Sequence, residues 1–204
     1  MAKVKTLILL VLGLATCAFS QSQSSEFTTA DSIAFSKFYV SIEGGEKYPF
    51  GDLVDAVDNA FYAGLGARYA YWEDFDGIIL FQYSYFEPHS KIPHIYGVHE
   101  VSGKLGLDYR WKLISPVILG AGFLCNWTRA DYDVDKDKLD FRRDPGATLV
   151  DNETEFGWFA RLNLPVLSLE NYRIGMNLLW EQVWTLPERS NMLSVGLYVE
   201  RRIW

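Results

Sequence analysis

The sequence predicts an all-β fold: a closed eight-stranded antiparallel up-and-down transmembrane β-barrel. Three observations predict it. Apolar residues alternate with polar ones along eight stretches, the connections between stretches are alternately long and short, and aromatic residues gather at the stretch ends. Alternation at every second residue gives a strand one apolar and one polar face. Because several polar faces carry charges that an ordinary core excludes, we expect the apolar faces to contact lipid and the polar faces to line the interior.

The first twenty residues have the features of a secretory signal peptide. Lys3 and Lys5 precede an apolar run at 7–14, and Ala18-Phe19-Ser20 offers small residues for cleavage before Gln21. A transmembrane anchor is an alternative, but the run is shorter than the roughly 20 residues that span a bilayer. Lipidation of Cys17 is a second alternative. We therefore predict a signal peptide at 1–20, a flexible periplasmic tail at 21–35 that is rich in Ser, Thr and Gln, and a barrel domain at 36–204.

The net charge argues against a nucleic-acid-binding protein, and the cysteine count excludes a disulfide-stabilised fold. Removing 1–20 takes away two lysines and no acid, which leaves 17 basic and 26 acidic residues and a net charge of −9. Such an acidic chain argues against nucleic acid as a partner. Only Cys125 remains in the mature chain, which excludes a disulfide framework. No other stretch is long and apolar enough for a transmembrane helix, so the chain must cross a membrane as strands.

The strands are expected where the alternation holds. The clearest alternation runs from Val101 to Trp111, where Lys104, Asp108 and Arg110 lie opposite the apolar track. The expected strands are 37–44, 60–72, 78–86, 101–111, 117–129, 155–164, 172–184 and 193–203.

The connections indicate which end of the barrel faces outward. Long loops are expected at 45–59, over about a dozen residues after Phe86, and at 130–154, with a modest loop at 187–191. Short turns are expected at 73–77, 112–116 and 165–171. This alternation is typical of short periplasmic turns and longer extracellular loops.

Aromatic residues form two predicted girdles, as amphipathic rings favour the membrane interfaces. One girdle lies beside the short turns: Tyr69, Tyr71, Tyr109, Trp111 and Tyr172. The other lies beside the long loops: Tyr83, Tyr85, Trp127, Phe156, Trp158, Trp180 and Trp184. A soluble sandwich or a lipocalin-like barrel with an apolar interior would not need this sorting.

From about Lys37 to Trp204, these patterns resemble the small outer-membrane β-barrels of the OmpA/OmpX type. The resemblance implies export to a Gram-negative outer membrane and contact with its lipid and lipopolysaccharide. It also implies that a terminal aromatic residue is read by the barrel insertion machinery. Trp204 matches this feature, although it lies on the polar track of the last strand.

The inward-facing charges are the first candidates for a functional site. They are Arg68, Lys104, Asp108, Arg110, Arg161, Arg173, Glu181, Glu200 and Arg202. We expect them to pair and plug the lumen, since side chains can fill an eight-stranded barrel. The alternative is a narrow or gated path for ions or small solutes. Inward glycines are expected to make room for the long arginines, and they are Gly64, Gly66, Gly106, Gly120, Gly122, Gly157, Gly175 and Gly196.

The loop at 130–154 is the best candidate for recognising an extracellular ligand or a host surface. Asp131, Asp133, Asp135 and Asp137 alternate in it and could collect Ca²⁺ or bridge cations at the lipopolysaccharide surface. The loop lacks the glycine of an EF-hand, so a solvated acidic loop is the preferred interpretation.

Three histidines, His89, His94 and His99, cluster between the third and fourth strands. They could form a metal site or part of an acyl-chain hydrolase, and exposed loop histidines are the preferred interpretation. A lipid-modifying enzyme would need one of them against a serine or a carboxylate on the lipid-facing side. Ser90, Ser102, Glu87 and Glu100 are near in sequence, but no motif fixes a triad.

We therefore predict no catalytic, cofactor-binding or metal-binding residues, and a non-enzymatic role in envelope integrity or surface adhesion. An enzyme, a small-solute channel and a soluble periplasmic barrel remain as alternatives.

Overall fold

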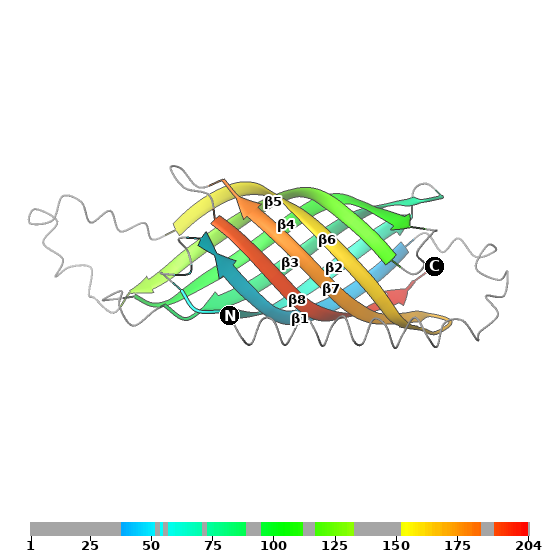
Figure 1. Cartoon of the computed structure of the whole chain (residues 1–204), viewed down its shortest axis with the longest axis horizontal. Helices are drawn as coiled ribbons and strands as arrows, with labels where there is room; N and C mark the ends of the chain where they lie inside the picture. Colours follow the sequence, from blue (N-terminus) through cyan, green and yellow to red (C-terminus); the bar gives the residue numbers. More distant parts are fainter. Residues whose placement is uncertain are drawn as a thin grey trace, which may run out of the picture.

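A computed structural model describes residues 38–51, 54, 57–70, 73–88, 95–111, 117–132, 152–184 and 190–203. Its strands are β1 (Phe38–Phe50), β2 (Ala60–Ala70), β3 (Phe75–Phe86), β4 (Ile95–Trp111), β5 (Val117–Tyr132), β6 (Asn152–Ser168), β7 (Tyr172–Val183) and β8 (Ser190–Arg202). Each strand pairs antiparallel with the next, and β8 returns to β1, so the sheet closes into a barrel (Figure 1). The predicted fold class is confirmed.

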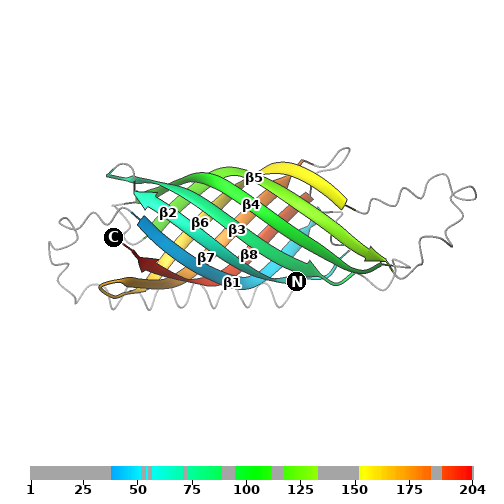
Figure 2. The ribbon, with the colours of Figure 1, turned by 180° about the vertical axis from the view of Figure 1, so that it is seen from behind.

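The strands are strongly tilted against the barrel axis, and the pairing register measures this tilt. Register partners followed once around the barrel from Val40 lead back to β1 at Phe50, ten residues further along. Such a stagger is what closing a sheet requires, and with eight strands it leaves an interior that side chains can fill. Figure 2 shows the same tilt from the other side.

The polarity of the barrel is inverted relative to a water-soluble protein. Phe61, Phe123 and Ile42 on the outer face are 76%, 72% and 65% exposed, whereas Lys47 and Glu181 on the inner face are fully buried. An apolar surface of this extent on a monomer marks contact with an apolar environment. The barrel therefore has the surface of a protein that crosses a membrane through its strands.

The aromatic girdles lie at opposite ends of the outer face, as predicted. We call the two ends the turn end, where β2 meets β3, and the loop end, where β1 meets β2. The turn-end aromatics are Tyr69, Tyr109, Trp111 and Tyr172, and the loop-end aromatics are Tyr83, Tyr85, Trp127, Phe156, Trp158, Trp180 and Trp184. Tyr71 lies outside the described residues.

Several expected strand ends were wrong. β1 continues to Phe50 instead of ending at Gly44, and β6 continues to Ser168 instead of Leu164. Both extensions contain a proline, which lacks the amide donor of a central strand. Pro49 and Pro165 are tolerated because each lies where its strand pairs with one neighbour only, β8 and β7 respectively.

The other corrections shorten the connections. β3 begins at Phe75, β4 begins at Ile95 and β5 ends at Tyr132, so both edges of the expected 130–154 loop belong to strands. The ends of β4 and β5 extend the barrel wall at the left of Figure 1.

The expected signal peptide, the tail at 21–35, Cys17 and Trp204 lie outside the described residues, as do Asp133, Asp135 and Asp137. Among the residues that are described, no helix is long and apolar enough to cross a membrane.

Candidate functional site

The interior of the barrel holds a network of buried ion pairs and hydrogen bonds. Six cations and six carboxylates take part: Lys47, Arg68, Lys104, Arg110, Arg161 and Arg173 with Glu43, Asp76, Glu100, Asp108, Glu181 and Glu200. They form two clusters, one toward each end of the barrel. Because the formal charges balance, the interior can be enclosed without a large net charge.

The loop-end cluster is built on two lysines that share one carboxylate. Lys47 Nζ lies 2.5 Å from Glu100 Oε1 and 2.6 Å from Glu181 Oε2, and Lys104 Nζ lies 2.9 Å from Glu181 Oε1. Lys104 also donates to Ser102 Oγ at 2.5 Å and to Gln82. The side chains of both lysines and of Glu181 are fully buried, so each charge depends on these partners.

Glu43 lies nearer the turn end than Lys47 on β1, and two side-chain amides bind its carboxylate. Gln82 and Asn177 donate to its two carboxylate oxygens, the latter at 2.9 Å. Tyr62 of β2 donates to Asn177 Oδ1 at 3.0 Å, so the amide of Asn177 on β7 connects the carboxylate to the tyrosine.

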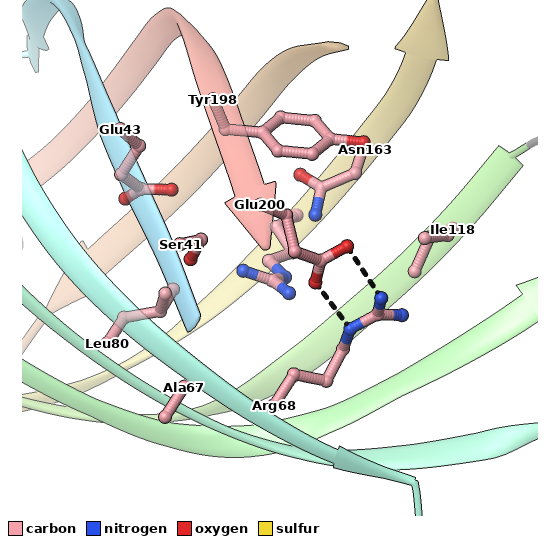
Figure 3. Close-up of a pocket in the computed structure, with 10 residues that line it drawn as sticks. Ser41, Glu43, Ala67, Arg68, Leu80, Ile118, Asn163, Tyr198 and Glu200 are labelled. Carbon is pink, nitrogen blue, oxygen red and sulfur yellow. Dashed lines mark hydrogen bonds and ion pairs between the residues drawn. The ribbon is translucent and has the colours of Figure 1, made fainter. Parts of the chain in front are cut away.

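The turn-end cluster uses arginines in place of lysines. Arg68 donates to both oxygens of Glu200, at 2.8 and 2.7 Å (Figure 3). Arg68 also donates to Asp76 at 2.7 Å. Arg110 also binds Asp76 through two nitrogens, and Arg161 binds Asp108 in the same way. Arg173 adds a longer contact to Glu200 at 3.3 Å. Guanidinium groups suit this arrangement because their fork matches the two oxygens of a carboxylate.

A small cavity borders the turn-end cluster, with Arg68, Arg161 and Glu200 among the residues that line it, and Figure 3 shows this lining. Its volume of about 10 Å³ is close to what one water molecule needs. Tyr198 Oη and Asn163 Oδ1 are buried lining atoms without a hydrogen-bond partner among the described residues. We expect a bound water to satisfy both atoms.

Apolar side chains cover the loop-end cluster. We call five of these side chains the apolar cap: Val57, Ala60, Phe86, Val183 and Met192, each at most 7% exposed. They belong to a larger packed group that also contains Ile78, Leu124, Phe159 and Leu179. Val57 precedes β2 and is held by a bridge to Pro88 and by the hydrogen bond from Asp58 N to Glu87 O, at 2.8 Å. The cap lies between the buried charges and the loop end.

Eight of the nine predicted inward charges take part in the network. The ninth, Arg202, donates to Asn171 at 3.4 Å instead. Sequence reasoning missed four members: Lys47, Glu43, Asp76 and Glu100. It placed Lys47 and Asp76 in connections and treated Glu100 as a possible catalytic neighbour. Glu43 was placed on the polar track of the first strand but was not counted among the inward charges. The alternation of 43, 45, 47 and 49 on the inner track of β1 was the available signal, and Gly44-Gly45 and Pro49 concealed it.

The prediction for the inward glycines holds at Gly120, where an added Cβ would lie 2.8 Å from Arg161 Cγ. The prediction is wrong at Gly64, Gly66 and Gly157, which face Gln82 and Glu43, Ser41 and Leu80, and backbone atoms of β7 respectively. Elsewhere the glycines make room for aromatic side chains, as Gly196 does for Tyr62. Gly106 and Gly122 face Phe159, and Gly175 faces Tyr198.

On the outer face at the loop end, His99 joins two neighbouring strands. Its Nδ1 lies 2.7 Å from Tyr83 Oη, and its Nε2 lies 2.8 Å from Asp131 Oδ2. The other residues considered with it do not join this group. Ser102 and Glu100 point into the lumen and bind lysines, and His89, His94 and Ser90 lie outside the described residues. Among the residues described, no group of three or more His, Cys, Asp or Glu side chains could hold a metal ion.

Comparison with solved structures identifies the fold. Neisserial surface protein A matches with a TM-score of 0.52 and 14% sequence identity, over 81% of this chain and 97% of that one. The chain has the fold of the small eight-stranded outer-membrane β-barrels. The Yersinia pestis outer membrane protein Ail in a phospholipid nanodisc is also similar, with a TM-score of 0.49 and 15% identity over 79% of this chain and 98% of that one. No family model matches the chain, and no curated protein matches its sequence.

Proposed function

We propose that this protein is an integral barrel of a bacterial outer membrane with a closed lumen and a non-enzymatic role at the cell surface. The observation that carries the proposal is the balanced interior network beneath the apolar cap. Lys47 and Glu181 occupy the lumen with fully buried side chains. Apolar residues above them disfavour a continuous file of water, because apolar constrictions dewet. The fold and the exposed apolar exterior support the membrane location.

The longest connection between described strands supports a role in surface interaction. It comprises the nineteen residues from 133 to 151, between β5 and β6, at the end that we assign to the cell exterior. Long loops on a rigid barrel are the usual carriers of recognition. Replacing 133–151 by a short Gly-Ser linker should leave the barrel intact and abolish adhesion of whole bacteria to extracellular matrix.

The closed lumen is tested by conductance. The full chain, purified from the outer-membrane fraction and shown by heat-dependent gel mobility to be folded, should give no steady current in planar bilayers. The double variant Lys47→Ala/Glu100→Ala removes one cation and one carboxylate, keeps the charge balance, and should produce a measurable leak. Steady current through the wild-type barrel would overturn the closed lumen and favour the small-solute channel.

A lipid-modifying enzyme is the second candidate, because His99 lies against the Asp131 carboxylate on the outer face. Within the described residues, the hydroxyl in contact with His99 belongs to Tyr83 rather than to a serine. Mass spectrometry of lipopolysaccharide and phospholipid after incubation with the barrel should show no change. A product that disappears in His99→Asn would instead establish the enzyme.

A further inference from the structure

The outer face of β3, β4 and β5 at the loop end carries a group of polar and aromatic side chains, which we call the rim cluster. It consists of Tyr83, Tyr85, His99, Arg129 and Asp131. We propose that the rim cluster binds the phosphorylated sugar headgroup of an outer-leaflet glycolipid of the lipopolysaccharide type. This proposal rests on the outer-membrane location proposed above, and it names a binding site on the barrel wall for that lipid.

The rim cluster is pre-organised, because three neighbouring side chains hold the imidazole ring of His99 in place. Its two ring nitrogens are bound by Tyr83 and Asp131, at 2.7 and 2.8 Å, and its ring centroid lies 5.0 Å from that of Tyr85. Hydrogen bonds to both nitrogens hold the plane of the ring. His99 therefore orients the carboxylate of Asp131.

A glycine in β4 secures the position of Tyr85. A Cβ added at Gly97 would lie 2.4 Å from Tyr85 Oη and 2.5 Å from Cε2, so the tyrosine ring occupies the space of a missing side chain. The ring would have to move for any other residue at this position.

The exposed atoms of the cluster suit a phosphorylated sugar. The side chains of Asp131 and Arg129 are 44% and 60% exposed, with 3.6 Å between Arg129 Nε and Asp131 Oδ1. A carboxylate accepts hydrogen bonds from sugar hydroxyls, and a guanidinium binds phosphate through its fork. Tyr83 and Trp127, which are 46% and 40% exposed, offer apolar ring faces beside them.

The level of the cluster along the barrel favours a lipid headgroup as the ligand. Tyr83, Tyr85 and Trp127 belong to the loop-end girdle, which marks the membrane interface. Trp127, Arg129 and Asp131 are successive outward-facing residues of β5, and Asp131 lies nearest the loop end. They therefore lie beside lipid headgroups. A glycolipid fits better than a phospholipid, because Asp131 would repel a bare phosphate and accept from sugar hydroxyls.

Binding is tested with the full chain in phosphatidylcholine nanodiscs that contain a limiting amount of rough-type lipopolysaccharide. Asp131→Asn and Arg129→Gln should each weaken lipopolysaccharide retention about tenfold in native mass spectrometry, the loss of one charge-assisted contact. Arg201→Gln is the matched control. Arg201 is an outward arginine at the turn end that lies 5.6 Å over the Tyr172 ring, and its substitution should leave retention unchanged.

Two results would overturn the proposal. One is wild-type retention in Asp131→Asn. The other is an equal loss in Arg129→Gln and Arg201→Gln, which would show nonspecific attraction of anionic lipid. Heat-dependent gel mobility and conductance of the same samples report separately on the membrane barrel and its closed lumen. Failure of this site is therefore distinguishable from failure of the proposed function.

Discussion

The two halves of the lumen balance charge by different chemistry. At the loop end, lysines with fully buried side chains share carboxylates beneath the apolar cap. At the turn end, arginines bind carboxylates through two nitrogens, and Arg110 and Arg173 remain 33% and 30% exposed. A compact ammonium loses its hydration completely and needs several enclosed acceptors, whereas a guanidinium is more weakly hydrated and tolerates a partly wet site. The comparison indicates that the loop end is the sealed end, whereas at the turn end Arg110 and Arg173 reach solvent.

The largest expected effect comes from removing the shared carboxylate at the loop end. Glu181→Gln should lower the free energy of unfolding by about 3–5 kcal/mol, since it leaves two buried ammonium groups short of a charged partner. Urea titration of the barrel in detergent micelles measures this loss.

Glu200→Gln is the matched change at the turn end. Its main partner, Arg68, retains Asp76, so we expect a smaller loss of about 1–3 kcal/mol. A loss equal to that of Glu181→Gln would contradict the contrast between the two halves.

Exchanging the two kinds of cation should sharpen the contrast. Lys47→Arg inserts a larger group into a fully enclosed position and should destabilise the barrel by about 1–3 kcal/mol. Arg173→Lys, at a partly exposed position with one long contact, should stay within about 0.5 kcal/mol. Thermal unfolding of the two variants in the same lipid compares them directly. If both changes cost the same, enclosure does not decide which cation is used.

Two glycines on the inner track of β5 test whether backbone or side-chain neighbours limit substitution. A Cβ at Gly122 would lie 2.2 Å from Leu105 O and 2.5 Å from Gly106 Cα, both backbone atoms. At Gly120 the nearest atoms are the ends of Asp108 and the stem of Arg161, which can shift. We expect Gly122→Ala to cost about 1–3 kcal/mol and Gly120→Ala less. Urea midpoints report the order, and a reversed order would show that the arginine side is the more tightly packed.

The sequence was sufficient for the architecture because the period of a strand is two, so one apolar track fixes the direction of every side chain along it. Arg68, Arg161 and Glu181 were placed in the lumen in this way. The alternation of apolar and polar residues does not show how far a strand continues into the connection beside it. Lys47 was missed because a proline near it argues against a central strand, and only the staggered pairing of a closed barrel leaves β1 a single neighbour at Pro49.

The outer-face contacts of His99 could not be predicted for a related reason. His99 and Asp131 are 32 residues apart, and they meet only because the β4–β5 pairing continues beyond the expected strand ends to Gly97 and Asp131. Alternation shows whether a side chain faces the lumen or the outside. The position of a residue along the barrel axis depends on the pairing register. Register is set by the pairing of whole strands rather than by any one of them.

The smallest expected effect concerns screening by salt. A double-mutant cycle on Arg173 and Glu200 should give a coupling of about 0.2–1 kcal/mol at 0.1 M salt, because one partner is partly exposed, and this coupling should fall toward zero at 1 M salt. The cycle on Lys47 and Glu181 should give a coupling that does not change over the same range, because both side chains are fully buried. Exposed and enclosed pairs respond differently since only the former lie within reach of mobile ions. Equal salt dependence of the two couplings would mean that the loop end is also wet, and the apolar cap would then not be the seal.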